Sequence, residues 1–330
     1  MMKSLFIMGA GVSGSYLYAK TRDEFDIRVY EMNLQRRGHS CGWATFIDKL
    51  QECLSLVNLR AADYVKNKLD EICVNGIRLP VRGQAIIDKP RLLQDLLPEE
   101  RITRGVVYPT IADGKGVIVN ATNVPFGMYK SIPAVQHAVH INGMEPNINY
   151  FYVNPRKAGY AWLFPLDDEG KEWHVGANVL DGSPMNLLQE SYKFYKIMQP
   201  EKFTCSCGRS INVVLPREAQ ILGDNGAASV GEAAGVVSPL SGEGMVPSME
   251  SVIVFHRIVQ SGISLAVYEE EMRRRLFDNV GRDHAIWEKM KVNPRMAWTD
   301  TFRYALEKWE GRGHVGLFQK LRAGLEILLR

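Results

Sequence analysis

Hydrophobic and polar positions near the amino terminus predict a strand, a turn, a helix and a second strand. Ser4–Met8 is an apolar run of the kind found in buried strands. Ser15–Thr21 has the spacing of a helix, and Ile27–Tyr30 is a second apolar run that ends at Glu31. These elements form one compact strand–turn–helix–strand unit.

The centre of the chain changes from mixed patterning to short strands rich in aromatic residues. Helical spacing appears at Ala61–Leu69 and at Pro90–Leu97, and Gly116–Ala121 predicts a buried strand. Four further runs bounded by turn residues predict an antiparallel sheet: Val135–Ile141, Ile148–Val153, Gly159–Phe164 and His174–Val179.

Beyond residue 218 the short strands return, at Ala219–Leu222 and Ala228–Val230, and lead into the glycine-rich segment Gly231–Gly244. Helical spacing then covers Val246–Gln260 and most of residues 263–330. Strand–glycine–helix elements therefore occur at two distant places in the chain. We expect two lobes that interleave in sequence.

Composition narrows the class of protein. The chain has 330 residues, 46% hydrophobic and 23% charged, which is enough for a large core and two lobes. Its 40 basic and 37 acidic side chains give a formal charge of +3 and no reason to expect nucleic acid as a partner. No apolar run reaches the ~18 residues of a membrane-spanning helix. We expect a cytosolic protein, and a peripheral contact with a membrane surface stays open.

The five cysteines are an odd number without the spacing of a disulfide framework. Cys205 and Cys207 form a Cys-x-Cys pair, but no second pair completes a four-thiolate zinc site. We therefore expect free thiols in a reducing compartment, a structural role for this pair and no metal centre.

Three glycines after the first strand have the spacing of a dinucleotide-binding turn. Gly9 permits a tight turn, Gly11 lets the backbone approach a pyrophosphate, and Gly14 lets the helix pack closely on the strand. The helix amino terminus offers N–H groups to the phosphates. Glu31 can accept hydrogen bonds from ribose hydroxyls, which favours FAD or NAD over NADP.

The second glycine-rich segment favours FAD over NAD. Val230–Gly235 places Glu232 after a strand and a glycine, where a carboxylate suits the ribityl chain of a flavin. Ser238–Gly244 then opens a helix with a turn suited to a pyrophosphate or the edge of a flavin ring. NAD has no ribityl chain, so we infer that the cofactor is FAD.

With these motifs the sequence resembles the geranylgeranyl reductase family, within the larger class of flavoproteins shaped like p-hydroxybenzoate hydroxylase. The resemblance is carried by the amino-terminal fingerprint through Glu31, by Ser40–Trp43, by Gly159–Pro165 and by Gly231–Gly244, with fainter similarity at Asp88–Leu96 and Val117–Asn123.

We therefore expect an α/β fold with an interleaved Rossmann-type FAD-binding lobe, an antiparallel-sheet substrate lobe and a helical C-terminal tail. The expected boundaries are 1–60, 85–124 and 219–262 for the FAD-binding lobe, 61–84 and 125–218 for the substrate lobe, and 263–330 for the helical region.

The resemblance also implies roles for individual residues. The ADP half of FAD would contact Gly9, Gly11, Val12, Ser13, Gly14 and Glu31. The ribityl chain and the isoalloxazine ring would contact Cys41, Gly42, Gly231, Glu232, Pro239, Gly242, Gly244 and Met245. A polyprenyl cavity would be lined by Tyr160, Trp162, Phe164, Pro165 and Gly176. Flat aromatic walls suit a long apolar substrate, and the alternative is an aromatic stripe that merely fills the interface between sheet and flavin.

Cys41 is the candidate catalytic residue. Hydride transfer from reduced flavin to an unactivated double bond must be matched by a proton delivered to the other carbon. A thiol, whose ordinary pKa is about 8.5, is mostly protonated at neutral pH and can supply that proton. The alternative is a small apolar residue packed beside the cofactor.

A few positions depart from the family pattern. Glu232 stands where aspartate is usual, and Lys89 stands where arginine is common. Thr122 and Asn123 replace an acidic or glycine-containing signature, and Asn178 replaces the second glycine of a Gly-x-Gly motif. These changes bear on the substrate assignment more than on FAD binding.

The predicted function is saturation of carbon–carbon double bonds in a polyprenyl (geranylgeranyl) group of a lipid or quinone by reduced FAD. The alternatives are a flavin-dependent monooxygenase or halogenase, because Gly159–Pro165 also resembles the GWxWxIP halogenase signature, and a non-catalytic flavin-binding protein. No second nucleotide fingerprint is visible, so the electron donor is expected to be transiently bound NAD(P)H or a small redox protein. Leu317–Arg330 has one apolar helical stripe, which packs on the protein or lies at a membrane interface and admits a lipid substrate.

Overall fold

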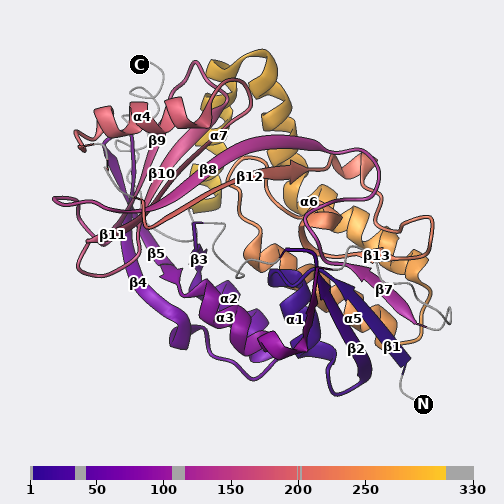
Figure 1. The fold of residues 1–330 in the computed structure, drawn as a ribbon. Coiled ribbons are helices and arrows are strands. Elements are labelled where there is room, and N and C mark those ends of the chain that lie inside the picture. Colours follow the sequence, from indigo (N-terminus) through magenta and orange to yellow (C-terminus); the bar gives the residue numbers. More distant parts are fainter. Residues whose placement is uncertain (1–2, 34–41, 106–115, 199, 201–202, 310–330) are drawn as a thin grey trace.

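The computed structural model describes residues 3–33, 42–105, 116–198, 200 and 203–309, with the backbone alone for 302–309. Two sheets organise this part of the chain (Figure 1). Sheet A has five parallel strands in the order β13-β7-β1-β2-β6. Its strands are β1 (Lys3–Met8), β2 (Phe25–Glu31), β6 (Ile102–Arg104), β7 (Val117–Asn120) and β13 (Ala228–Ser229).

Sheet B has eight strands in the order β12-β8-β11-β10-β9-β4-β5-β3, and all neighbours are antiparallel except β4 and β9. Its strands are β3 (Ala44–Phe46), β4 (Val65–Val74), β5 (Ile77–Ile87), β8 (Lys130–His140), β9 (Ile148–Val153), β10 (Gly159–Pro165), β11 (Glu172–Val179) and β12 (Cys205–Val213).

The described helices cover these sheets and connect them. They are α1 (Val12–Thr21), α2 (Ile47–Ser55), α3 (Lys89–Leu96), α4 (Pro184–Phe194), α5 (Met245–Gln260), α6 (Leu265–Val292) and α7 (Pro294–Trp309). Short 3-10 helices are η1 (Ala61–Tyr64), η2 (Glu99–Arg101), η3 (Pro216–Glu218) and η4 (Gly231–Ala234). Figure 1 shows α4 on the outer side of sheet B, and α6 and α7 running from the sheet A lobe to sheet B.

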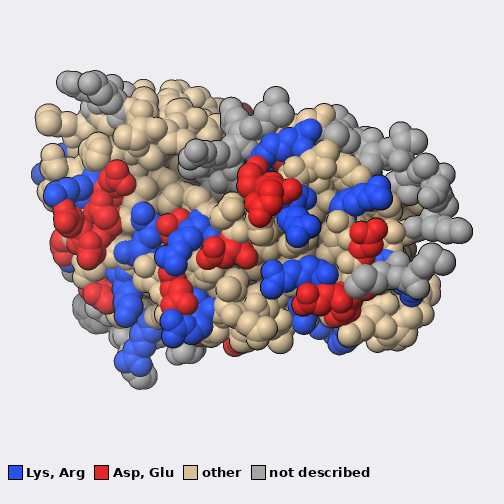
Figure 2. All heavy atoms as spheres, turned by 60° about the horizontal axis from the view of Figure 1, so that its bottom comes forward, with Lys and Arg blue, Asp and Glu red and all other residues tan. Residues whose placement is uncertain are grey.

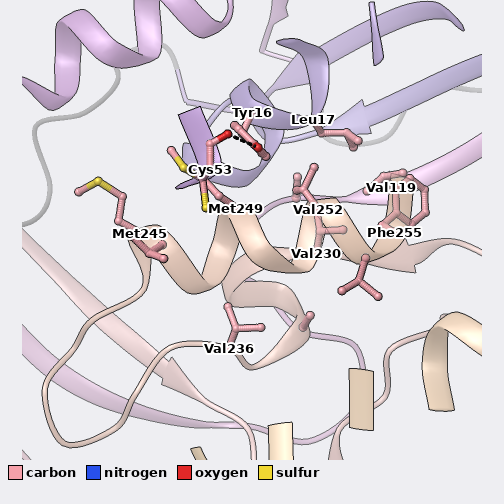
Figure 3. Packing of buried hydrophobic residues seen from close by; sticks show 14 of the residues in the cluster. Tyr16, Leu17, Cys53, Val119, Val230, Val236, Met245, Met249, Val252 and Phe255 are labelled. Atoms are coloured by element: carbon pink, nitrogen blue, oxygen red, sulfur yellow. Dashed lines mark hydrogen bonds between the residues drawn. The ribbon is translucent and has the colours of Figure 1, made fainter. Parts of the chain in front are cut away.

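The core beside sheet A joins segments that are far apart in the sequence. Figure 3 shows side chains of α1 and α5 packed together over the sheet, among them Tyr16, Leu17, Met249, Val252 and Phe255. The buried Tyr16 hydroxyl donates to the backbone oxygen of Cys53 at 2.7 Å, which ties α1 to α2. This core therefore fixes the amino end of α1 relative to the amino end of α5, where both glycine-rich segments lie.

Sheet B has two buried faces of different character. One face packs against α4, with Leu163 and Trp173 of the strands and Leu187 of the helix all fully buried. The other face carries Tyr160 and other aromatic side chains and turns toward the sheet A lobe and α6. Both faces are buried because the sheet lies between helices on one side and a second lobe on the other.

The predicted elements are confirmed around the first glycine-rich segment, in the helix after the second, and in the four strands from Val135 to Val179. The strand predicted at Ala219–Leu222 is wrong, because only isolated bridges form there, at Gln220 and Leu222. The helix predicted at Ala61–Leu69 is wrong. Only η1 is helical there, and the chain continues as β4, which pairs with β5 through a turn at Asn75 and Gly76. The buried residues Ala61 and Tyr64 belong to η1, whereas Leu69 and Ile72 belong to β4, whose regular alternation is interrupted by a register shift between Leu69 and Glu71.

Charged side chains of both signs intermix over the face of the molecule shown in Figure 2, without one extended patch of a single sign among the described residues. Many of them form exposed pairs, such as Arg60 with Asp63. Across the described part of the chain, no helix is both long enough and apolar enough to span a bilayer.

Candidate functional site

Two glycines shape the turn after β1, and at each of them protein backbone lies where a Cβ atom would be. Gly9 has a φ of +107°, and a methyl group on it would lie 2.6 Å from the backbone oxygen of Ala121. A methyl group on Gly14 would lie 1.9 Å from the oxygen of Gly9. The turn and the first turn of α1 can therefore pack this closely only because both positions are glycine.

Gly11 in the same turn has a different environment. A methyl group there would meet nothing within 4 Å, and the residue is exposed. Gly11 caps α1 without any side-chain hydrogen bond, so the first N–H groups of the helix at Val12 and Ser13 face an open position. Backbone donors and the positive end of a helix dipole beside open space form a site for a pyrophosphate.

Glu31 lies beside this turn. Its Oε2 accepts a hydrogen bond from the N–H of Ala10 at 2.9 Å, and its Oε1 accepts one from the N–H of Asn33 at 2.9 Å. The carboxylate is half-buried and retains lone pairs for further donors. If a dinucleotide placed its pyrophosphate at Gly11, its ribose would lie beside the Glu31 carboxylate.

The two glycine-rich segments meet at Ser13. Gly231 has a φ of +65°, and a methyl group on it would lie 2.5 Å from Ser13 Oγ. Its N–H donates to Ser251 Oγ of α5 at 2.8 Å, and Ser13 Oγ donates to the oxygen of Ala121 at 3.4 Å. The structure thus joins residues predicted from opposite ends of the sequence into one site.

Glu232 lies at the next position and interacts with residues of β12 and of the start of α3. Its Oε1 accepts the N–H of Asn212 in β12 at 3.1 Å. Burial raises the pKa of Glu232, while that hydrogen bond and the positive charges of Arg209 and Lys89 oppose the rise. A carboxylate held by one backbone donor and flanked by two cations can accept further hydrogen bonds from the hydroxyls of a polyol chain.

The segment from Ser238 to Gly244 is a closed loop that ends at the amino terminus of α5. The N–H of Ser238 donates to the oxygen of Glu243 at 3.1 Å, and the N–H of Gly242 donates to the oxygen of Ser238 at 2.9 Å. Gly242 has a φ of +68°, and no side chain caps α5 at Gly244. Met245 is the first residue of α5 and is buried in the core, as Figure 3 shows. Pro239 lies within the loop.

The aromatic residues predicted for the substrate lobe lie on one face of sheet B. Tyr160, Trp162 and Phe164 are each 9% exposed and belong to one cluster with Trp43. Gly176 lies directly beneath the indole of Trp162, because a methyl group there would lie 2.3 Å from its Cζ2. Helices α6 and α7 add Ile286, Met290 and Trp298 to the same cluster, so protein already covers part of this face.

Gly42 brings the predicted Cys-Gly segment to this aromatic face. A methyl group on Gly42 would lie 2.5 Å from Cε2 of Phe164 and 3.6 Å from Nε1 of Trp162. That Nε1 is buried and has no hydrogen-bond partner among the described residues. A buried N–H donor beside Gly42 is therefore available to a bound molecule. Pro165, at the end of β10, is buried, and its carbonyl oxygen faces Asn67.

A small pocket lies where sheet B, the 238–244 loop and the carboxy-terminal helices meet. The space inside it is enough for little more than one water molecule. Its lining includes Tyr160, Asn178, Pro239, Trp287 and Trp298. The Nε1 of Trp287 is buried without a partner among the described residues. The pocket therefore offers mostly apolar walls with a few polar groups.

Two predicted features lie outside the described residues: Cys41 and the segment Leu317–Arg330. Cys205 and Cys207 are half-exposed on β12, at the edge of sheet B, and are not joined in a disulfide. Within the described ranges, no group of three or more His, Cys, Asp or Glu side chains gathers in a way that could hold a metal ion.

Three residues near the site were not predicted to have a role there. Asn212 donates to Glu232, Asp283 of α6 accepts from the hydroxyl of Ser238, and Trp43 lies edge-on to His174 at 4.4 Å. No sequence signal marks Asn212 or Asp283, because each reaches the site through long-range packing. Trp43 directly follows the Cys-Gly pair in the sequence, and this position could have indicated that it lies near the site.

Comparisons with known proteins extend this description. No protein-family model and no curated protein matches the chain. Among solved structures, a geranylgeranyl bacteriochlorophyll reductase-like protein from Thermoplasma acidophilum aligns over 98% of this chain and 95% of its own, with a TM-score of 0.68 and 15% identity. A variant of HpxO from Klebsiella pneumoniae complexed with FAD covers 99% of this chain and 95% of its own, with a TM-score of 0.64 and 12% identity.

A 2-methyl-3-hydroxypyridine-5-carboxylic acid oxygenase also aligns, over 90% of this chain and 93% of its own, with a TM-score of 0.65 and 14% identity. The chain has the fold of these flavoproteins. At 12–16% identity the likeness establishes the arrangement of the two sheets and the helices, as predicted from the sequence, and leaves the reaction to be argued from the residues.

Proposed function

We propose that the protein binds FAD and works as a flavin-dependent oxidoreductase. The observation that carries this proposal is the open position over Gly11, bordered by the uncapped end of α1 and the Glu31 carboxylate. Gly231 and Glu232 adjoin the same helix end, so the acceptors and donors for both halves of the cofactor form one continuous site. The FAD-bound HpxO variant, which has the same fold, supports the choice of cofactor.

The finer proposal is the saturation of carbon–carbon double bonds in a polyprenyl group. It is supported by the aromatic face of sheet B beside Gly42 and by the fold shared with the Thermoplasma acidophilum protein, whose name refers to geranylgeranyl bacteriochlorophyll reduction. When bound, FAD would supply the hydride. Trp162 and Phe164 would hold the chain by apolar contact and exclude water, and Cys41 would deliver the proton to the second carbon.

Monooxygenation is the second candidate. Two of the similar structures, HpxO and the pyridine carboxylic acid oxygenase, support it by fold. A local observation favours it as well: the buried N–H of Trp162 beside Gly42 has no partner among the described residues and can donate to a polar substituent of a small ring. The electron donor is proposed to be NAD(P)H bound transiently or a small redox protein, and a lipid substrate implies peripheral contact with a membrane surface.

One experiment separates these reactions. The purified protein is reconstituted with FAD, reduced anaerobically with dithionite and mixed with a geranylgeranyl-containing lipid. Reductase activity predicts reoxidation of the flavin without oxygen and a product heavier by two hydrogen atoms per double bond. Monooxygenase activity predicts no anaerobic turnover, and oxygen uptake coupled to a product that contains one added oxygen atom. Failure to take up FAD would refute both reactions.

A matched pair of variants tests the role of Cys41 in the reductase reaction. Cys41→Ser keeps the size of the side chain and replaces the thiol by a much weaker acid, so proton delivery slows by about 10²–10⁴ in single turnover while flavin reduction is unchanged. Cys205→Ser is the control for loss of a half-exposed thiol on β12. If Cys41→Ser saturates the lipid at the parent rate, the thiol is not the acid.

A further inference from the structure

The 238–244 loop, defined as residues Ser238 to Gly244, is anchored to sheet B through the hydroxyl of Tyr160. This hydroxyl donates to the backbone oxygen of Ser241 at 2.6 Å. Tyr160 is 9% exposed, and the Cβ position of Gly242 lies 3.5 Å from the same hydroxyl oxygen. The bond joins residues 81 positions apart and spans the boundary between sheet B and the sheet A lobe. It is a contact between two lobes rather than within one.

Asn178 lies directly opposite Tyr160 in the register of β10 and β11, and both residues line the same small pocket, so their side chains are neighbours on one face of the sheet. Asn178 is 6% exposed. A glycine at this position, as the Gly-x-Gly pattern of the resembled family would have, has no side chain to reach the tyrosine. The amide at 178 therefore restricts the direction in which the Tyr160 hydroxyl points.

The loop is rigid enough to transmit such a restraint. Its two backbone bonds, Ser238 to Glu243 and Gly242 to Ser238, close it into a single unit. Ser238 Oγ accepts the N–H groups of Leu240 and Ser241 at 3.3 and 3.2 Å and donates to Asp283 of α6. Sheet B thus holds the loop at Ser241, and α6 holds it at Ser238.

We propose that Tyr160 and Asn178 form a latch that fixes the 238–244 loop against sheet B and thereby sets the affinity for FAD. The cofactor half of this inference rests on the proposed function, in which the loop borders the flavin. Tyr160 and Asn178 act as positioning residues through Ser241 and Gly242. A Tyr160 that merely walled an apolar cavity would need no such bond to the other lobe.

Hydrogen exchange in the FAD-free protein tests the structural half. Tyr160→Phe removes the donor to Ser241 and leaves the ring in place, so the amides of Ser238 and Gly242 are expected to exchange roughly fivefold to tenfold faster. Tyr192→Phe is the matched control, because Tyr192 is buried on the opposite face of sheet B and its hydroxyl has no partner among the described residues. In Tyr192→Phe, the amides of Ser238 and Gly242 are expected to exchange at the rate of the parent protein.

FAD affinity and the flavin midpoint potential test the other half. Tyr160→Phe is expected to weaken FAD binding roughly fivefold to tenfold and to shift the potential, and Tyr192→Phe is expected to change neither. Asn178→Ala is expected to have a smaller effect than Tyr160→Phe, and the double variant should bind FAD no more weakly than Tyr160→Phe alone, because both changes release one latch. Thermal unfolding of each FAD-free variant confirms that the fold is retained.

The outcomes separate this inference from the proposed reaction. Parent-like loop exchange in Tyr160→Phe overturns the latch. Faster exchange with unchanged FAD affinity overturns its link to the cofactor. A parent protein that binds FAD but saturates no prenyl chain overturns the proposed reaction and leaves the latch in place. A parent that binds no FAD overturns both the proposed function and the link to the cofactor.

Discussion

The two glycine-rich segments, residues 9–14 and 231–244, resemble each other in sequence but differ in what surrounds their glycines. In the first, a methyl group on Gly14 would collide with backbone at 1.9 Å, while one on Gly11 would meet nothing within 4 Å. In the second, protein atoms border each such position: Ser13 beside Gly231, Val214 beside Gly235, Tyr160 beside Gly242 and Val237 beside Gly244.

The difference separates glycines whose Cβ position is filled by other protein atoms from Gly11, whose Cβ position is open. The first segment leaves an open place and can be approached closely by a pyrophosphate at Gly11. In the second segment the glycines permit close packing between parts of the protein. Its contribution to binding must therefore come from backbone groups and from Glu232. A glycine-rich motif in a sequence does not by itself distinguish these two uses.

The largest effect on stability is expected for Gly14→Ala, which adds a methyl group where protein backbone already fills the space. The methyl group would lie 1.9 Å from Gly9 O, and backbone on both sides leaves little room to relax. We expect the free energy of unfolding to fall by about 4 kcal/mol or more, measured by urea denaturation of the FAD-free protein. Gly208→Ala in β12 is the control, because its methyl group would meet only Ala134 O at 3.8 Å. Equal stability of the two variants would contradict the packing argument.

Gly11→Val tests whether the open position beside Gly11 is used by the cofactor. Because its Cβ would meet no protein atom, the urea midpoint of the FAD-free variant should match that of the parent within error. Its FAD affinity should fall by roughly a hundredfold or more, since the side chain occupies the place of the pyrophosphate. The measurement is quenching of flavin fluorescence on titration. A variant that binds FAD with parent affinity would show that the pyrophosphate lies elsewhere.

Glu31→Gln is expected to have an intermediate effect. The amide keeps one acceptor oxygen but presents an NH₂ group to either the Ala10 N–H or the Asn33 N–H, both of which now donate to the carboxylate. Loss of charge-assisted bonds of about 1.5–3 kcal/mol weakens FAD binding by roughly ten- to a hundredfold. Titration with FMN, which lacks the adenosine, provides the control: any FMN affinity should be unaffected by the substitution.

The smallest effect concerns Glu232 and depends on pH. Burial raises the pKa of this carboxyl in the folded protein above its value in the unfolded chain. The resulting stability is present at pH below the unfolded value of about 4.3 and is lost as the pH rises through the folded pKa. Glu232→Gln removes this dependence, so the FAD-free variant should melt slightly higher than the parent at pH 7 and without that advantage near pH 4. The opposite trend would mean that Lys89 and Arg209 outweigh burial.

Elements built from short-range signals were predicted correctly from the sequence. The unit from β1 to β2 needs only a strand, three glycines and a helix in succession. The strands β9, β10 and β11 are consecutive antiparallel neighbours, and β8 pairs with β11. The hairpin of β4 and β5 was missed, although Asn75 and Gly76, both with positive φ, are a strong turn signal. The strand β12 was missed because its Cys-Ser-Cys-Gly start lacks apolar alternation.

The candidate site was predicted in its parts but not in its connections. The local sequence is enough to identify Gly9, Gly14 and Gly231 as candidate site residues. Contacts such as Asn212 with Glu232, or Tyr160 with Ser241, join residues 20 and 81 positions apart across sheets and lobes. Such pairs depend on how the two lobes pack against each other, and no local pattern in a single sequence predicts that packing.

The order of strands in sheet A has a consequence for how the chain folds. The central strand β1 is synthesised first, yet its neighbour β7 comes from residues 117–120 and the edge strand β13 from residues 228–229. The contact of Gly231 with Ser13 forms later still. Contacts of such long sequence separation close slowly, because the entropy of a large loop is lost before the contact stabilises anything. The amino-terminal unit therefore gains its last contacts only after about two hundred further residues have been made.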